Sequence, residues 1–374
     1  TASIDHHTMR RVHIAKTLFT NKPTSQFILN NRFYATLSVK EAKVAQFKQF
    51  GAIEDVVKVE TVTLPSELKA DEVLVKFLAA PINPADLNIV QGNYGTTPNL
   101  PAVGGSEGVA VVEQVGSGVT DLKVNQRVIP AKAGLGTWRT HAVLKANDLQ
   151  TVSADIPVEY AATIAVNPCT AYRLLTDFAD LKSGDVIVQN AANSAVGLSV
   201  IQIAKARGIK TINIIRDRPN KEYVIEKLKQ LGGDIVVTEE YANSVNMQKL
   251  VSDLPKAKLA LNSVGGQSAR TVARFLGEKG TLVTFGGMSR KPIIIPTSPF
   301  IFSDITLRGF WLTRWVEQNS KAERQKMIDE IAQLIKNKQL VLFQETFKFS
   351  DFDSAVKANN QSYRSRKVVL KMDQ

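Results

Sequence analysis

The chain of 374 residues is long enough for two or three domains, since a typical domain holds about 150 residues. Its composition, 44% hydrophobic and 22% charged, is that of a globular protein that buries a sizeable core. No apolar run approaches the roughly 18 residues that a membrane-spanning helix needs, and the single cysteine, Cys169, excludes an internal disulfide. Three of the four histidines lie within the first 13 residues, which leaves His141 and disfavours metal catalysis.

The N-terminal 34 residues carry a concentrated part of the net charge of +12. Five basic residues stand there against a single acid, Asp5, among many Ser and Thr residues. This composition is typical of a mitochondrial transit peptide, and Arg32, shortly before an aromatic residue, resembles a matrix-protease cleavage site. The sequence therefore predicts residues 1–34 as a transit peptide, a mature chain beginning near Ala35 and a location in the mitochondrial matrix. A disordered basic tail is the alternative.

The charge excess of +8 that remains outside this segment is not arranged as a basic stripe interleaved with aromatic residues. We therefore expect a solvated surface, with no nucleic-acid partner and no membrane partner. A basic patch for an acidic carrier or a phosphate-rich cofactor stays open.

Short β-branched runs bounded by Gly, Pro and Asn predict that the first folded part, about residues 43–165, is rich in β-strands. These runs lie at residues 72–78, 108–115 and 127–130. Between them, a segment dense in turn residues contains Asn83-Pro-Ala-Asp86 and Gln91-Gly-Asn-Tyr94-Gly.

From about residue 166 to 304, strands alternate with helical stretches, which is the pattern of a parallel sheet covered by helices. The last part, residues 320–374, has one amphipathic helix at residues 322–338. Strand-like segments follow, ending at Lys371, and they can return to the N-terminal β-rich part. The five strands expected in the parallel sheet lie at residues 185–190, 210–215, 234–237, 258–262 and 281–285.

A turn of small residues, Ala191-Ala-Asn-Ser-Ala-Val-Gly197, follows the first of these strands and leads into a helix. Small residues let the backbone approach a pyrophosphate, which then lies at the helix N-terminus. The turn is a degraded form of the motif G-x-G-x-x-G. Its place inside a β-α-β unit favours a dinucleotide site over a plain turn rich in Ala and Ser.

The segment Arg216-Asp217-Arg218 ends the second strand, about 20 residues beyond the turn, where NAD sites place an acid and NADP sites place arginine. Two guanidinium groups favour NADPH, because they pair with its 2′-phosphate. The alternative is a solvated arginine pair with Asp217 binding NAD. Two further strand ends, Asn262-Ser-Val-Gly-Gly266 and Phe285-Gly-Gly-Met288, lie where open α/β sheets bind ligands.

Taken together, seven motifs of the chain resemble those of the mitochondrial trans-2-enoyl-thioester reductases, a zinc-independent branch of the medium-chain dehydrogenase/reductase superfamily. The resemblance covers about residues 43–374. It implies an α/β fold with a GroES-like, β-rich catalytic domain from residues 43–165 and 305–374, and a Rossmann domain with a doubly wound parallel sheet from residues 166–304. The motifs are Asn83-Pro-Ala-Asp86, Gly104-Gly-Ser-Glu-Gly108, Gly134-Leu-Gly-Thr-Trp-Arg-Thr140, Asn167-Pro-Cys-Thr-Ala-Tyr172, Arg216-Asp-Arg-Pro219, Phe285-Gly-Gly-Met288 and Gly309-Phe-Trp-Leu312.

The resemblance also implies the roles of individual residues. Tyr94 corresponds to the proton donor of the family. Trp311 is expected to line the acyl slot, in addition to its implied contact with NADPH. Ala195 stands where relatives often have glycine. The implied NADPH-binding residues are Asn167, Asn193, Ser194, Ala195, Val196, Arg216, Asp217, Arg218, Phe285, Gly286, Gly287, Met288, Phe310, Trp311, Leu312 and Lys367.

In zinc-dependent relatives, three loops supply the metal ligands, and they correspond here to Asn83, Ser106 and Asn167. None of these suits a catalytic zinc site, which requires thiolate or imidazole ligands. The comparison therefore implies that the carbonyl is polarised without a metal.

The activity implied by the resemblance is the NADPH-dependent reduction of a trans-2-enoyl thioester in mitochondrial fatty-acid synthesis, by a homodimer. The thioester is carried on acyl carrier protein or coenzyme A. Hydride adds to C3, charge develops on the thioester oxygen and a proton reaches C2. Two alternatives stay open. One is a zinc-free NADPH quinone oxidoreductase, which does not need Tyr94, and the other is a non-catalytic scaffold with an inherited nucleotide site.

Overall fold

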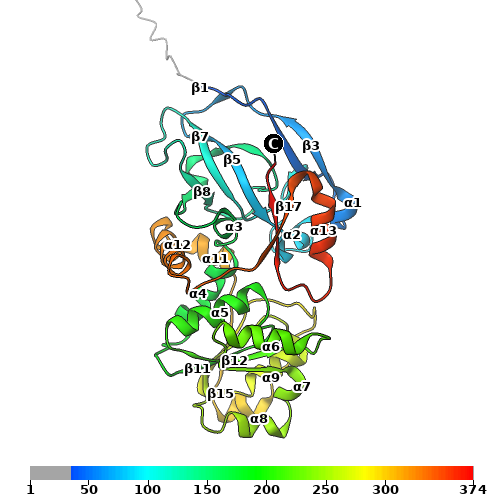
Figure 1. Cartoon of the computed structure of the whole chain (residues 1–374), viewed down its shortest axis with the longest axis vertical. Coiled ribbons are helices and arrows are strands. Elements are labelled where there is room, and N and C mark those ends of the chain that lie inside the picture. Colours follow the sequence, from blue (N-terminus) through cyan, green and yellow to red (C-terminus); the bar gives the residue numbers. More distant parts are fainter. Residues whose placement is uncertain (1–34, 374) are drawn as a thin grey trace, which may run out of the picture. The chain divides into compact units, whose positions relative to one another are not determined.

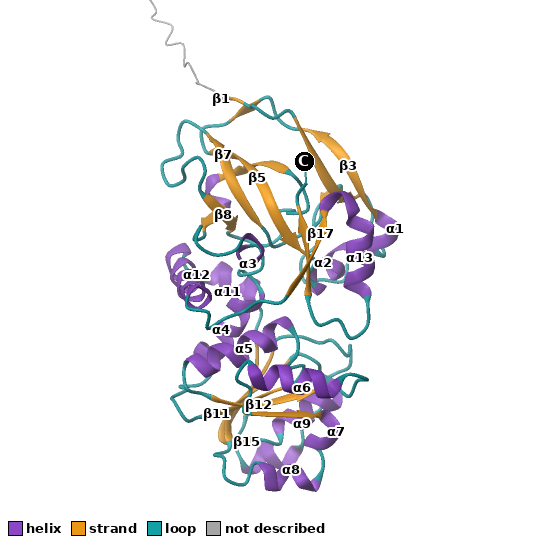
Figure 2. Ribbon diagram, in the orientation of Figure 1, coloured by secondary structure: helices purple, strands orange, loops and turns teal. Residues whose placement is uncertain are grey.

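The computed structural model describes residues 35–373. The predicted transit peptide, residues 1–34, lies outside the described residues. The described part contains a β-rich lobe and a lobe built on a parallel sheet, which Figure 1 and Figure 2 show with their helices and strands. No helix within residues 35–373 is long and apolar enough to cross a membrane.

The β-rich lobe is organised around a seven-stranded sheet in which β5 (Glu72–Pro81) pairs with three neighbours. Val73, Val75 and Phe77 place one face of β5 in a core cluster, and Leu74 and Ala80 of the same strand are fully buried in other clusters. The other strands of this sheet are β7 (Val109–Val115), β8 (Arg127–Pro130), β9 (His141–Lys145), β10 (Leu149–Thr151), β17 (Gln344–Lys348) and β18 (Lys367–Lys371). Two smaller sheets contain β2 (Glu41–Phe47), β3 (Val57–Thr63) and β6 (Ala102–Val103), and β1 (Ala35–Thr36) with β4 (Glu67–Leu68).

The C-terminal strand β18 pairs antiparallel with β5, with Val369 opposite Pro81. The end of the chain therefore returns to the N-terminal lobe, where the sequence pattern predicts it. The helices of this lobe are α1 (Ile53–Val56), α2 (Pro84–Val90), α3 (Val158–Ala161) and α13 (Phe352–Asn360), with short 3-10 turns at Ala146–Asp148 and Phe349–Asp351.

One buried side chain holds two glycine-containing motifs of the β-rich lobe together. Trp138 is fully buried, and its indole Nε1 donates to the carbonyl of Pro81 at 3.0 Å. A Cβ at Gly104 would overlap the Trp138 ring, so only glycine fits there. This packing fixes the loop that carries Ser106 and Glu107, the next residues of the same motif.

The second lobe contains a six-stranded sheet in which every neighbouring pair is parallel. Its strands lie in the order β13-β12-β11-β14-β15-β16, the arrangement of a Rossmann fold. The strands are β11 (Val186–Gln189), β12 (Lys210–Ile215), β13 (Ile235–Thr238), β14 (Ala257–Asn262), β15 (Leu276–Thr284) and β16 (Thr306–Gly309). Since β16 pairs with β15, this sheet extends beyond residue 304, where the sequence analysis ends the Rossmann domain.

The helices α4 (Asn167–Asp177) and α5 (Ala195–Ala206) pack together beside the sheet. A long helix predicted at residues 322–338 is present as α12 (Lys321–Lys336), and Ser320 caps it by accepting from the Glu323 amide. The remaining helices are α6 (Lys221–Gln230), α7 (Glu239–Ala242), α8 (Val245–Leu250), α9 (Gly266–Ala273), α10 (Thr297–Phe302) and α11 (Leu312–Gln318).

Candidate active site

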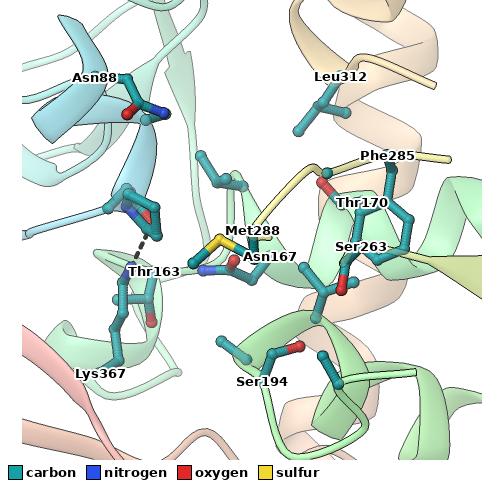
Figure 3. A pocket seen from close by; sticks show the side chains of 18 of the residues that line it. Asn88, Thr163, Asn167, Thr170, Ser194, Ser263, Phe285, Met288, Leu312 and Lys367 are labelled. Carbon is teal, nitrogen blue, oxygen red and sulfur yellow. Dashed lines mark hydrogen bonds between the residues drawn. The ribbon is translucent and has the colours of Figure 1, made fainter. Parts of the chain in front are cut away.

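A cavity of about 1300 Å³ is lined by residues of both lobes. It lies at the carboxyl ends of the parallel strands, where strand order reverses between β11 and β14 and open α/β sheets bind ligands. All the residues that the sequence analysis assigns to catalysis or cofactor binding line this cavity, with the exception of Asp217. Figure 3 shows Lys367 on one side of the cavity and Phe285 and Leu312 on the other, with Ser194 and Asn167 between them.

The predicted pyrophosphate turn leads directly into α5. Ser194 is the N-cap of this helix, and its hydroxyl accepts from the Gly197 amide at 3.1 Å. A Cβ at Gly197 would lie 2.5 Å from the carbonyl oxygen of Ala192, so the first turn of α5 can pack this closely against the preceding backbone turn only with glycine. Asn193, Ala195 and the other small residues of the turn therefore leave backbone exposed to the cavity at the positive end of the helix.

The second strand brings Arg216 and Arg218 to the same cavity. Asp217, between them, lies outside it and forms an ion pair with Lys221 at 2.9 Å on the surface of α6. Arg218 is only 5% exposed, and its desolvation, together with the nearby charge of Arg216, lowers the pKa of Arg218. The positive charges face the cavity without the carboxylate, which is the arrangement that suits a phosphate.

The strand ends β11, β14 and β15 are tied together by buried amide side chains. Asn190 donates to Asn262 Oδ1 at 2.8 Å and accepts from the Ser263 amide at 2.8 Å, and Asn262 donates to Thr284 Oγ1 at 3.1 Å. The segment Phe285, Gly286, Gly287 and Met288 follows Thr284 and lines the cavity. At Gly286 a Cβ would lie 3.0 Å from the Ser263 carbonyl, so this segment passes close to the neighbouring loop.

Tyr94 lies in the loop after α2 and is held by Trp311 of the other lobe. The Trp311 indole Nε1 donates to Tyr94 Oη at 3.1 Å, and the two rings meet edge to face with centroids 6.1 Å apart. Phe310, which precedes Trp311, is anchored because its amide donates to the Thr284 carbonyl at 3.0 Å. Leu312, the first residue of α11, lines the cavity next to them.

A cluster of buried charged and amide groups lies beside the cavity in the β-rich lobe, and its members Asn83 and Lys367 line the cavity. The side chain of Asn83 donates from Nδ2 to Glu107 Oε2 at 2.9 Å and accepts at Oδ1 from Lys367 Nζ. The backbone N–H of Asn83 donates to Asp86 Oδ2 at 2.8 Å. The other Glu107 oxygen accepts from the Val166 amide at 2.7 Å, immediately before Asn167 at the start of α4. This cluster connects the loop after β5, the C-terminal strand β18 and the start of α4.

Burial shifts the pKa values of this cluster toward the neutral forms. Desolvation raises the pKa of Glu107 to about 7 and lowers the pKa of Lys367, which is 8% exposed, to about 8. It also raises the pKa of Asp86, although the hydrogen bond from the Asn83 amide opposes this shift.

Asn83, Ser106 and Asn167, which the resemblance assigns to the positions of zinc ligands, all line the cavity. Within residues 35–373, no group of three or more His, Cys, Asp or Glu side chains is placed to hold a metal ion. Asn83 is already bonded to Glu107 and Lys367, so the protein's own ammonium group is the cation next to this position.

Several residues of the site were not assigned by the sequence analysis. Glu107 and Asp86 belong to the motifs Gly104–Gly108 and Asn83–Asp86, but these motifs do not indicate that the two carboxyl groups lie near the Lys367 ammonium group. Asn190 ends a predicted strand. An amide side chain at the end of an apolar strand was the one sequence feature that could have indicated its hydrogen bond to Asn262. Tyr363, which contacts Arg216 and Arg218, has no signal in the sequence at all.

Comparison with known proteins places these features in a family. Residues 69–154 match the alcohol dehydrogenase GroES-like domain, and residues 195–333 match the zinc-binding dehydrogenase family. The chain is 52% identical over 343 residues to the mitochondrial enoyl-(acyl-carrier-protein) reductase of Dictyostelium discoideum, covering 91% of this chain and 96% of the relative. It is 48% identical over 306 residues to the Homo sapiens enzyme of the same name, covering 82% of each.

Solved structures agree with these relatives. The mitochondrial 2-enoyl thioester reductase Etr1p/Etr2p heterodimer from Candida tropicalis has a TM-score of 0.82 and 33% identity, covering 89% of this chain and 100% of that chain. A complex of Etr1p with NADP and crotonyl-CoA has a TM-score of 0.83 at 32% identity with the same coverage. A putative NADPH:quinone reductase from Bacillus thuringiensis has a TM-score of 0.79 at 28% identity, covering 89% and 99%.

A GroES-like lobe joined to a Rossmann lobe, with a nucleotide-sized cavity lined by both, defines an oxidoreductase of the medium-chain dehydrogenase/reductase class. Within this class, identities near 50% over most of the chain are decisive. The chain belongs to the family of mitochondrial enoyl-(acyl-carrier-protein) reductases. The predictions of fold class, family, reductase activity and mitochondrial location are therefore confirmed.

Proposed function

We propose that this chain reduces trans-2-enoyl thioesters to saturated acyl thioesters with NADPH, and that Tyr94 is its proton donor. The observation that carries the proposal is the position of Tyr94. Its hydroxyl lies in the cavity that also contains the α5 N-terminus and the two arginines, and it is held there by Trp311. NADPH is the cofactor, and crotonyl-CoA, a 2-enoyl thioester, accompanies NADP in the related Etr1p complex.

The residues that line the cavity fit a phosphorylated dinucleotide. The Asn193–Val196 turn and the close approach at Gly197 leave room for a pyrophosphate, and Arg216 and Arg218 suit a 2′-phosphate. Asn167, the segment from Phe285 to Met288, the segment from Phe310 to Leu312, and Lys367 complete the proposed binding set. Asp217, which pairs with Lys221, has no direct part in it.

NADPH, when bound, supplies the hydride that C3 of the substrate accepts. The protein holds the substrate so that its reacting carbon stays within about 3–3.5 Å of the hydride donor, and it stabilises the negative charge that develops on the thioester oxygen. The proton then goes from Tyr94 Oη to C2, which completes the conversion of the C2–C3 double bond into a single bond. Solvent restores the phenol proton afterwards.

The hydrogen bond from Trp311 explains how the phenol is oriented for this step. An indole N–H is a donor only, so Tyr94 Oη must act as the acceptor in that bond. The phenol proton is then free to point toward the substrate. The same N–H stabilises the phenolate that remains once the proton has left.

The decisive experiment compares NADPH oxidation by the purified protein with crotonyl and decenoyl thioesters and with a quinone. We expect turnover with the enoyl thioesters and at most slow reaction with the quinone. Preference for the quinone would favour the alternative of a quinone reductase, and no turnover with any of them would favour a scaffold protein.

We also propose that the active form is a homodimer formed through β16. This strand is the edge of the parallel sheet, and all four of its residues are exposed. Next to it, α10 presents Phe300, Ile301 and Phe302, the last 82% exposed, and Leu307 of the strand is exposed too. An unpaired edge with apolar neighbours is suited to pairing with a second copy of the same strand.

Light scattering after gel filtration tests the dimer. We expect twice the mass of one chain for the protein, and the mass of one chain for Leu307→Glu. Val245→Glu alters an exposed apolar residue on α8 and is the matched control that should remain dimeric. A wild-type protein that runs as a single chain would contradict the proposal.

The finer aspects of location and domain division are proposals as well. We propose that the enzyme works in the mitochondrial matrix, with residues 1–34 removed. We also propose that residues 43–165 and the C-terminal segment with β17, α13 and β18 form one domain, and that the other domain runs from residue 166 through β16, because β16 belongs to the parallel sheet. N-terminal sequencing of the protein from mitochondria should begin near Ala35. A Thr1 terminus in a cytosolic fraction would contradict the transit peptide.

A further inference from the structure

The loop between α13 and β18 carries a tyrosine from the β-rich lobe onto the two arginines after β12. The Tyr363 ring centroid lies 4.5 Å from Arg216 Cζ and 5.2 Å from Arg218 Cζ. Arg218 also donates to the Tyr363 carbonyl, and its Nε donates to Asn220 Oδ1 at 2.7 Å. One side chain of the first lobe thus contacts both cationic groups of the second, and Tyr363 lines the same cavity.

The two positive charges at this contact, on Arg216 and Arg218, have no acidic side chain paired with them within residues 35–373. Asp217, the nearest acid in the sequence, is occupied by Lys221, and within residues 35–373 no carboxylate forms an ion pair with Arg216 or Arg218. Two like charges held beside one another repel; desolvation is the main cause of the lowered pKa of Arg218, and the like charge of Arg216 lowers it further. The electron-rich face of an aromatic ring offsets part of that repulsion without neutralising either charge. The two guanidinium groups therefore remain able to bind an external anion with more than one negative charge, such as a phosphate monoester.

The backbone of Tyr363 supports a specific role. Its φ is +61°, in the left-handed region that residues with a bulky side chain seldom adopt. Such a conformation persists where the surroundings hold it, and here the Arg218 guanidinium bonds to the carbonyl of the same residue. The ring and the carbonyl of Tyr363 together fix the position of the Arg218 side chain.

We propose that Tyr363 is a specificity-determining residue for the cofactor, which holds Arg216 and Arg218 in the orientation that accepts a phosphate monoester at the ribose 2′ position. This inference rests on the proposed use of NADPH and adds to it a residue from the other lobe. Free arginine side chains lose rotamer freedom when they bind a ligand, and that cost falls when a ring already holds them. Tyr363 therefore strengthens binding of the 2′-phosphate and has little effect on the rest of the nucleotide.

Direct binding of nucleotide fragments to the full chain tests this without turnover. The probes are 2′,5′-ADP, which carries the 2′-phosphate, and 5′-AMP, which does not, each titrated by calorimetry. We expect Tyr363→Ala to weaken 2′,5′-ADP by about three- to tenfold, which is the range expected for a cation–π contact, and 5′-AMP by less than twofold. Tyr363→Phe keeps the ring and should bind both as the wild type does.

The control is Tyr223→Ala, which removes an exposed tyrosine from α6 away from the cavity and should change neither affinity. Thermal unfolding of each variant confirms that it is folded. Unchanged or tighter binding of 2′,5′-ADP by Tyr363→Ala would overturn the proposal, the tighter case meaning that the ring blocks the phosphate position. If the wild type itself binds the two probes equally, the proposed NADPH preference fails, and this outcome is distinct from failure of the Tyr363 variant alone.

Discussion

The two walls of the cavity, one from the parallel-sheet lobe and one from the β-rich lobe, consist of different kinds of protein groups. On the side of the parallel sheet, short segments after β11, β12, β15 and β16 present backbone, small residues and two arginines. On the side of the β-rich lobe, single side chains meet from distant parts of the chain, as when Lys367 reaches Asn83 across 284 residues. The first wall suits recognition of a long phosphorylated cofactor, and the second suits placement of a few reactive or charged atoms. Changes on the second wall should therefore affect turnover or pH dependence, and changes on the first should affect cofactor affinity.

The largest effect should come from the β-rich wall. Tyr94→Phe removes one hydroxyl and keeps the ring, so we expect kcat to fall by about 10²–10⁴-fold, the usual contribution of a positioned general acid. Affinity for NADPH and thermal stability should remain close to wild type. Steady-state kinetics with crotonyl thioester and a melting curve measure both. Full turnover would assign the proton to solvent instead, and an unfolded variant would show that Tyr94 serves packing.

The matching change on the other wall is Arg216→Ala with Arg218→Ala. Charge-assisted hydrogen bonds contribute about 1.5–3 kcal/mol each when buried and less at an exposed position, so the pair should raise the KM for NADPH by about 10²-fold. The KM for NADH should change little, and kcat at saturating NADPH should be retained. Equal weakening of NADPH and NADH would show that the arginines serve the fold or the pyrophosphate.

A smaller effect is expected at the contact between the walls. Trp311→Phe removes the N–H that bonds to Tyr94 Oη and keeps an aromatic ring, so kcat should fall by up to about tenfold, as for one hydrogen bond. In a Tyr94→Phe background the same substitution should have no further effect on kcat, because its partner is already gone. Trp315→Phe, on α11, is the control and should leave kcat unchanged. Additive losses in the double variant would show that Trp311 acts on the substrate directly.

The same division explains how much the sequence alone reveals. The parallel sheet and its turns follow from local spacing: the strand predicted at residues 210–215 is the observed β12. The turn after β11 leads into a helix as expected, although α5 already begins at Ala195, inside the predicted turn. The cofactor wall is contiguous in sequence at each strand end, so its residues are recognisable by position.

The opposite wall depends on tertiary packing. Glu107, Asp86 and Lys367 carry no local pattern that says they meet, since their contact depends on β18 pairing with β5. Tyr363 reaches the arginines only through the conformation of one loop. The edge strand β16 falls beyond residue 304 for a similar reason, because its exposed residues lack the buried pattern that marks the other five strands. Such contacts are visible only in three dimensions.

The smallest effect concerns the buried cluster and the pH dependence of stability. Since burial raises the pKa of Glu107 from 4.5 to about 7, the native state binds more protons than the unfolded state between those values. The free energy of unfolding should therefore fall as the pH rises from about 4.5 to about 7. Lys367, whose pKa burial lowers to about 8, stays protonated in both states over most of this range and therefore adds little to the slope.

Denaturant unfolding of the wild type and of Glu107→Gln across this range tests the assignment. The variant cannot lose a proton at residue 107, so its stability should change less with pH, whatever its absolute value. Glu222→Gln alters an exposed carboxyl on α6 and should keep the wild-type slope. A slope that is the same in the wild type and in Glu107→Gln would mean that Glu107 is ionised throughout. In that case the charge of Lys367 would be matched by a carboxylate at every pH in the range, and the cluster would act as a fixed ion pair.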